Sequence, residues 1–103
     1  MRECDINKLI AEKVLGLEVK YDNIVREGRR SGIPQYSRNI DYAWLVVEKL
    51  SKKSDFELTK DCDDSFFMCE FAFGLNKVFV GKADTAPAAI CKAALSTVGI
   101  EIK

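Results

Sequence analysis

Histidine is absent from the 103-residue sequence. Its absence removes the commonest general base, the usual partner of a serine or cysteine nucleophile, and the commonest metal ligand. Any catalysis would have to use carboxylates, lysine or tyrosine, so we expect a binding protein and not an enzyme. A nucleotide hydrolase that uses acidic residues is the enzymatic alternative.

Long apolar runs and net charge are also lacking. No stretch approaches the 18 apolar residues of a membrane-spanning helix, and the N-terminus has no apolar signal-peptide core. We therefore expect a cytoplasmic protein with no membrane partner. Sixteen basic residues balance sixteen acidic ones, so no overall field draws the molecule to nucleic acid. The length suits one domain over residues 1–103.

The four cysteines form no C-x-x-C pair; they are Cys4, Cys62, Cys69 and Cys91. Without a secretory signal we expect reduced thiols that pack as small apolar side chains. Their spacing and the missing histidine argue against a zinc site, and we expect no metal and no cofactor. The acidic run from Asp61 to Asp64 has no EF-hand spacing and is typical of a soluble turn.

Three segments have apolar residues at helical spacing. The first covers residues 5–15, with Asp5 as N-cap and Gly16 as C-cap; the second covers about 38–52, with Ser37 as N-cap. The third opens at Thr85-Ala86-Pro87 and presents a small-residue face that can lie close to a sheet. Residues 17–21 alternate as a short strand, and residues 22–35 lose all periodicity and are predicted to be a loop.

Strand signals follow the second helix at residues 55–59, 66–73 and 78–81, separated by turn residues. Three strands with short turns predict an antiparallel meander. Because residues 66–73 are apolar on both faces, we expect layers on both sides of the sheet. The predicted fold is α/β of the α+β type: a three-layer α/β/α sandwich in the order α-(β)-α-β-β-β-α. Residues 100–103 add an edge strand or fray.

Three stretches carry a resemblance to a known family: residues 9–16, 34–50 and 83–95. They contain a first helix with its glycine stop, the motif Pro34-x-Tyr36-Ser37 before the second helix, and Ala83-Asp84-Thr85-Ala86-Pro87 before the last. In this order they resemble the phage ABA sandwich domain family. The resemblance implies the α/β/α fold and a phage origin, hence the host cytoplasm, but no family-wide catalytic set. The chain departs from the pattern at Arg38-Asn39 and at Ala88.

Arginine and tyrosine gather between Lys20 and Arg38, where five basic residues face two acidic ones. The guanidinium group of arginine can donate two parallel hydrogen bonds to phosphate oxygens, and glycines let the backbone approach a ligand closely. The segment also leads into a helix N-terminus, which favours an anion. The predicted ligand-binding residues are Arg26, Arg29, Arg30, Tyr36, Ser37, Arg38 and Tyr42. The plainer interpretation is a mobile, solvated loop whose arginines pair with nearby acids, with Trp44 in the core.

Two functions remain open beside the hydrolase. In the first, a phage-type sponge sequesters an anionic nucleotide-type ligand, such as a host immune signal; a cyclic nucleotide or an ADP-ribose derivative is our first choice, by analogy with other small phage sponges. A domain this small has little concave surface, so we expect a homo-oligomer with the site between subunits. In the second, the same arginines and tyrosines form a protein-interaction module that inhibits or adapts a host or phage protein.

Overall fold

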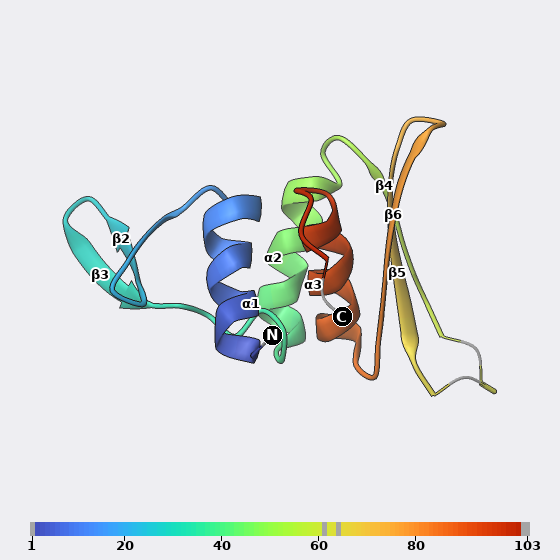
Figure 1. The fold of residues 1–103 in the computed structure, drawn as a ribbon, viewed down its shortest axis with the longest axis horizontal. Coiled ribbons are helices and arrows are strands. Elements are labelled where there is room, and N and C mark those ends of the chain that lie inside the picture. The colour runs from blue at the N-terminus through green and yellow to red at the C-terminus, as the bar shows by residue number, and fades with distance from the viewer. Residues whose placement is uncertain (1, 61, 64, 102–103) are drawn as a thin grey trace.

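A computed structural model describes residues 2–60, 62–63 and 65–101 (Figure 1). Within them the helices lie between two three-stranded antiparallel sheets, in the orders β1-β2-β3 and β4-β5-β6. The α+β class predicted from the sequence is confirmed. The elements are α1 (Glu3–Leu9), η1 (Ile10–Val14), β1 (Glu18–Lys20), β2 (Asn23–Arg26), β3 (Arg29–Gly32), α2 (Ile40–Leu50), β4 (Asp55–Thr59), β5 (Phe67–Phe73), β6 (Lys77–Ala83) and α3 (Ala86–Ser96).

The first helix has two parts. It begins at Glu3, so Asp5 lies in its first turn and the prediction of Asp5 as N-cap is wrong. After Leu9 the helix widens into the π-helix η1, in which the N–H of Leu15 donates to the carbonyl of Ile10 at 2.9 Å. The wider turn places Ile10 and Ala11, both fully buried, side by side in the core.

Residues 22–35 contain a hairpin, so the prediction of a loop there is wrong. Strands β1, β2 and β3 are joined by two-residue turns at Tyr21-Asp22 and Glu27-Gly28. All four turn residues have positive φ angles, the geometry of type I′ turns that matches the twist of paired strands. The signal is weak in the sequence because Ile24 is the one buried residue of β2 and β3, and β3 is exposed throughout.

Helix α2 is shorter than the predicted range of 38–52, and its N-cap is Asn39. The side chain of Asn39 accepts a hydrogen bond from the N–H of Asp41 at 2.9 Å. The prediction of Ser37 as N-cap is wrong because Ser37 is buried and bonded to Asn7 on α1. Trp44 is not a core residue: it is 47% exposed, and its ring meets Phe56 edge-on at 5.8 Å.

The predicted meander is confirmed as β4, β5 and β6, and α3 lies across it with Thr85 as its N-cap. The small-residue face of α3 does pack closely on the sheet. At Gly81 of β6 a Cβ atom would lie 2.4 Å from the backbone nitrogen of Ala93 and 2.6 Å from the carbonyl oxygen of Ala89. Only glycine allows α3 to come this near to β6.

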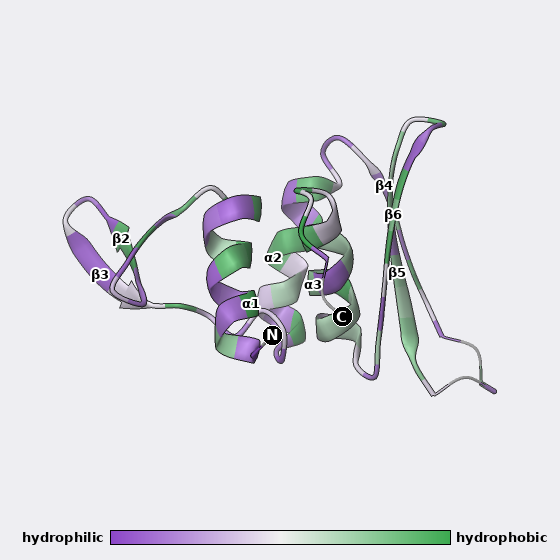
Figure 2. Cartoon of the chain, viewed as in Figure 1, coloured by the Kyte–Doolittle hydropathy of each residue, from purple (hydrophilic) through white to green (hydrophobic). Residues whose placement is uncertain are grey.

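One face of the β4–β6 sheet is covered, and the other is open. Cys69 and Phe71 of β5 are buried, and Figure 2 shows apolar colour on β5 and on the helices beside it. The alternate residues Met68, Glu70 and Ala72 face away from the helices, and Figure 1 shows all described helices on the covered side. The second layer expected on the sheet is therefore not supplied by the described residues, and Glu70 suits this face to water.

The cysteines divide into two pairs, all unbridged. Cys69 and Cys91 are buried as predicted, whereas Cys4 and Cys62 are exposed, so the prediction of burial is wrong for those two. Asp61 and Asp64 of the acidic turn lie outside the described residues, as do residues 102–103 of the C-terminal tail. No described helix is long and apolar enough to cross a membrane.

Candidate functional site

A buried polar contact holds α1 against the turn before α2. The side-chain oxygen of Asn7 accepts two hydrogen bonds from Ser37, one from its N–H at 3.0 Å and one from its hydroxyl at 2.9 Å. Both residues are almost fully buried. Because this contact fixes the backbone at Ser37, it also fixes the point from which the side chain of the next residue, Arg38, extends into solvent.

Arg38 lines a groove of about 750 Å³ that we call the α3 groove. It runs between the start of α1, the turn before α2, the residue just before β5, the end of β6 and the start of α3. Its volume is that of a small-molecule site. The lining residues are Glu3, Ser37, Arg38, Phe66, Lys82, Ala83, Asp84, Thr85, Ala88 and Lys92.

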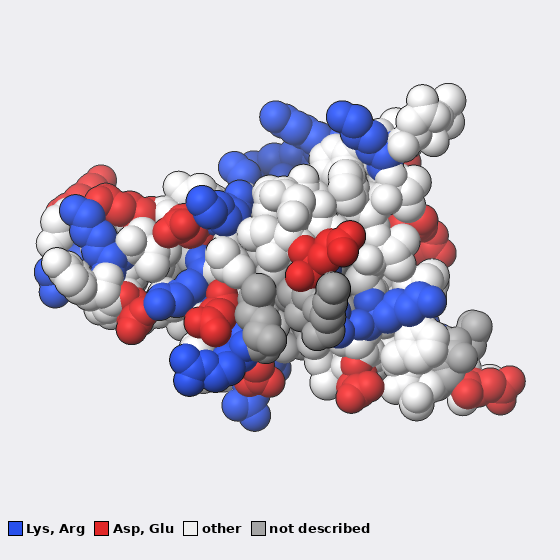
Figure 3. Space-filling view, in the orientation of Figure 1, with Lys and Arg blue, Asp and Glu red and all other residues white. Residues whose placement is uncertain are grey.

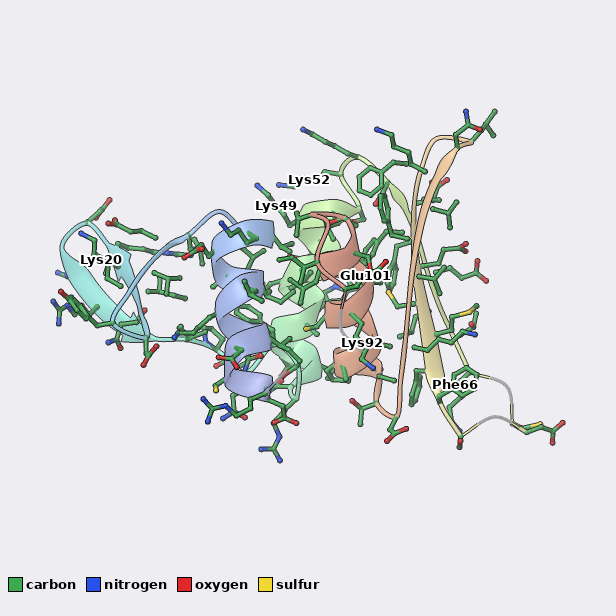
Figure 4. The ribbon with its side chains drawn as sticks, in the orientation of Figure 1. Lys20, Lys49, Lys52, Phe66, Lys92 and Glu101 are labelled. Atoms are coloured by element: carbon green, nitrogen blue, oxygen red, sulfur yellow. The ribbon has the colours of Figure 1, made fainter. Side chains whose placement is uncertain are left out.

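Three cations from distant parts of the chain line this groove. The guanidinium of Arg38 lies 3.4 Å from the carboxylate of Glu3, and both side chains are more than half exposed. The ammonium of Lys82 lies over the ring of Phe66, 5.4 Å from its centroid. Lys92 extends from α3 toward the sheet (Figure 4), and its ammonium donates to the carbonyl oxygen of Lys82 at 3.1 Å. Glu3 and Asp84 offset two of the three positive charges.

The start of α3 borders the groove, although its backbone donors are largely taken. The hydroxyl of Thr85 accepts the N–H of Ala88 at 3.3 Å, and Pro87 has no N–H to offer. The first turn of the eleven-residue helix contributes the positive end of its dipole. The groove therefore combines ammonium and guanidinium donors with the positive end of the α3 dipole and the ring of Phe66.

Arg26 and Tyr36 line a separate, smaller groove of about 310 Å³ between β2 and α2, which also includes Lys49 and Lys52. The ring of Tyr36 is only 2% exposed and meets Tyr42 edge-on at 6.4 Å. Burial raises the pKa of Tyr36, and Arg26 opposes that rise. Tyr36 is thus a core residue at the floor of this groove, not a platform open to a base.

Arg29 and Arg30 belong to neither groove. They begin the exposed strand β3, where Arg29 is the direct cross-strand partner of Arg26 and the guanidinium of Arg30 lies 5.8 Å from the ring of Tyr21. Figure 3 shows positive and negative side chains interspersed at this end of the molecule. The structure thus divides the predicted set: Ser37 and Arg38 at the α3 groove, Arg26 and Tyr36 at the smaller one, Arg29 and Arg30 on the hairpin, and Tyr42 beside Tyr36.

Sequence reasoning missed most of the α3 groove, above all Phe66, Lys82 and Lys92. These residues are single charges or rings in segments that look like ordinary strand ends or helix. The one available signal was Thr85-Ala86-Pro87, which fixes the start of α3 and hence a place where an anion is favoured.

The two buried thiols are chemically quiet. Burial raises the pKa of Cys69 and of Cys91 from 9.0 to about 12. Both stay protonated at neutral pH, whereas the thiolate is the nucleophilic form. Neither Cys69 nor Cys91 is suited to act as a nucleophile.

These features define a class, a small α+β sandwich in which helices pack on one face of an antiparallel meander. The family model described as the phage ABA sandwich domain matches residues 8–95, so the chain belongs to that family and the resemblance drawn from the sequence is confirmed. A crystal structure of a phage protein from Bacillus cereus ATCC 14579 is similar, with 48% identity and a TM-score of 0.90. The similarity covers 100% of this chain and 93% of that one. No curated protein matches the sequence.

Proposed function

We propose that this phage-family protein sequesters an anionic, nucleotide-type ligand in the α3 groove, such as a cyclic nucleotide or an ADP-ribose derivative that signals in host immunity. One observation carries the proposal: Arg38, Lys82 and Lys92 line a single groove together with an aromatic ring and the start of a helix. These are the groups that bind phosphate and stack on a base.

The groove offers a distinct role to each part of such a ligand. The Nε of Arg38 lies against the carboxylate of Glu3, and the other N–H groups of the guanidinium can donate to phosphate oxygens. The ammonium of Lys92 donates to a carbonyl oxygen, which a phosphate can replace with a stronger, charge-assisted bond. The ring of Phe66, which the Lys82 ammonium now covers, can stack on the base when Lys82 turns to a phosphate.

We propose binding without turnover. The sequence has no histidine, and the buried thiols are held protonated. We also propose that the protein acts as a homo-oligomer, because a groove open to solvent encloses a ligand better when a second subunit covers it.

The test is calorimetry against a panel of cyclic nucleotides, ADP-ribose derivatives and inorganic phosphate. The double variant Arg38→Gln with Lys92→Met removes two cations from the groove and keeps most of the side-chain volume. Each charge-assisted hydrogen bond contributes about 1.5–3 kcal/mol, so we expect at least about a 100-fold loss of affinity.

The matched control is Arg29→Gln with Arg30→Gln, which removes two cations from the hairpin. We expect its affinity to change less than about threefold. The proposal fails if no member of the panel binds at micromolar concentration, or if the hairpin variant loses binding and the groove variant does not.

One observation favours a second candidate, an interaction with an acidic protein surface through β2 and β3. Arg26 and Arg29 are directly opposed across the hairpin, and like charges in that position repel each other. A carboxylate from a partner would relieve the repulsion. A pull-down from host lysate distinguishes the two: a stoichiometric protein partner lost in the hairpin variant, and unaffected by nucleotide, supports this candidate.

A further inference from the structure

We propose that strand β6 is the contact between two copies of this chain, which pair antiparallel through their free β6 edges and extend the β4–β6 sheet across a two-fold axis. The inference names the surface behind the proposed association of subunits. It does not depend on any ligand, and its test is separate from the binding test.

The direction of the β6 backbone follows from one hydrogen bond. Strand β6 lies at the edge of the sheet, paired on one side with β5. The carbonyl of Lys82 accepts the ammonium of Lys92, so it points to the free side. Because backbone groups on a strand alternate in direction, those of Val78 and Val80 point to the free side as well. The β6 edge thus offers N–H and C=O groups at alternate positions to another strand.

Among the described strands at sheet edges, β6 is the one best suited to pairing. It is seven residues long, with Val78 49% and Val80 42% exposed. Valine and phenylalanine favour strands. Edge strands are commonly protected by charge, and β4 has Asp55 and Glu57 on its exposed face while β3 begins with Arg29. Between Lys77 and Lys82, β6 has no charge.

An antiparallel pair centred on Val80 is self-complementary. Val80 then faces its own copy, Val78 faces the partner's Lys82, and Lys77 faces the partner's Ala83. No pair opposes two like charges, which would be destabilising. The N–H of Val78 in one copy can then donate to the carbonyl of Lys82 in the other copy, where it replaces the ammonium of Lys92. Pairing therefore releases the Lys92 ammonium into the α3 groove.

Disulfide trapping tests the register. In a background where the exposed Cys4 and Cys62 are serine, Val80→Cys should form a covalent dimer on mild oxidation, since facing residues lie about 5.5 Å apart between Cα atoms. Val78→Cys alone should not, because the two copies of residue 78 are offset by about 13 Å along the strands. Combining Val78→Cys with Lys82→Cys should restore cross-linking.

Sedimentation over a concentration series tests the affinity. A seam of one strand pair is smaller than a standard interface of about 1,600 Å², so we expect a concentration-dependent dimer. Val80→Lys places like charges across the axis and should raise the dimer dissociation constant at least about tenfold. Val98→Lys, at an equally exposed valine, should leave it unchanged.

Three results would overturn the proposal. The chain stays monomeric at millimolar concentration; Val98→Lys weakens the dimer as much as Val80→Lys; or Val78→Cys cross-links as fast as Val80→Cys. If the chain is monomeric and the Val78 and Val80 amides become protected from hydrogen exchange only with another protein, β6 pairs with that protein instead.

Discussion

Gly81 shows how a missing side chain sets the distance between two elements. A methyl group there would enter the backbone of α3 at Ala89 and Ala93, and neither backbone atom can move without shifting the helix. We expect Gly81→Ala to destabilise the fold by about 1–3 kcal/mol through overpacking. Urea unfolding measures the loss. Gly32→Ala is the control, because nothing lies within 4 Å of its Cβ and its effect should stay within about 0.5 kcal/mol.

Asn7 is a second residue whose role is clear from its contacts. Its side-chain oxygen satisfies both the N–H and the hydroxyl of the buried Ser37. Asn7→Ala leaves two buried donors without a partner and should cost about 1–3 kcal/mol. Ser37→Ala removes only the hydroxyl bond and should cost less. Equal losses in urea unfolding would show that the backbone bond contributes nothing to stability.

The buried thiols predict an alkaline limit to stability. Their pKa values are raised to about 12 in the folded protein and return to about 9 on unfolding. Above pH 9 the unfolded chain loses these protons first, so stability is complete below pH 9 and declines between pH 9 and 12. Each thiol contributes a slope of up to about 1.4 kcal/mol per pH unit. Urea midpoints measured from pH 8 to 11 should fall more steeply for the native chain than for Cys69→Ala with Cys91→Ala.

At the scale of elements, the helices and strands that could be predicted from the sequence are those with a regular spacing of apolar residues. Helices α2 and α3 and strand β5 bury one stripe or face, and β4 half-buries Phe56 and Leu58, so apolar spacing reveals them. The β2–β3 hairpin was not predicted, because β2 and β3 bury only Ile24. In addition, its type I′ turn at Glu27-Gly28 is uncommon, since a charged residue there adopts a positive φ angle. The hairpin therefore forms through the geometry of its turn, and no pattern of buried residues in the sequence indicates it.

The candidate site was only partly predictable for a different reason. A charge count along the chain finds residues that are neighbours in sequence, and it found Arg26, Arg29, Arg30 and Arg38. The α3 groove joins Arg38 to Lys82 and Lys92, which no local window contains. Their meeting depends on the crossing of α3 over β6 and on the Asn7–Ser37 contact, both of which are tertiary.

The whole molecule is elongated, 46 × 28 × 23 Å with a radius of gyration of 13.6 Å, against about 13 Å for a compact chain of this length. The β1–β3 sheet, which contains the β2–β3 hairpin, extends away from the helices in Figure 1. It is joined to α1 by the ion pair of Lys8 and Asp22, and to the core by the buried Ile24 and the half-buried Val19. Asp22 raises the pKa of Lys8, but the pair is exposed, so solvent screens it and it contributes little.

We therefore expect the burial of Ile24 to control the local opening of the hairpin without affecting the rest of the fold. It is 4% exposed and packs on the core, while the remaining hairpin side chains are wholly or partly in solvent. Regions with so few buried contacts open on their own. Ile24→Ala should increase trypsin cleavage after Arg26, Arg29 and Arg30 by about 10- to 100-fold, the equivalent of about 1.4–2.7 kcal/mol of local opening. Hydrogen exchange in α2, α3 and β5 should change far less. Val25→Ala, on the opposite face of β2, is the matched control, and an equal rise in exchange across α3 and β5 would show instead that hairpin and helices unfold as one unit.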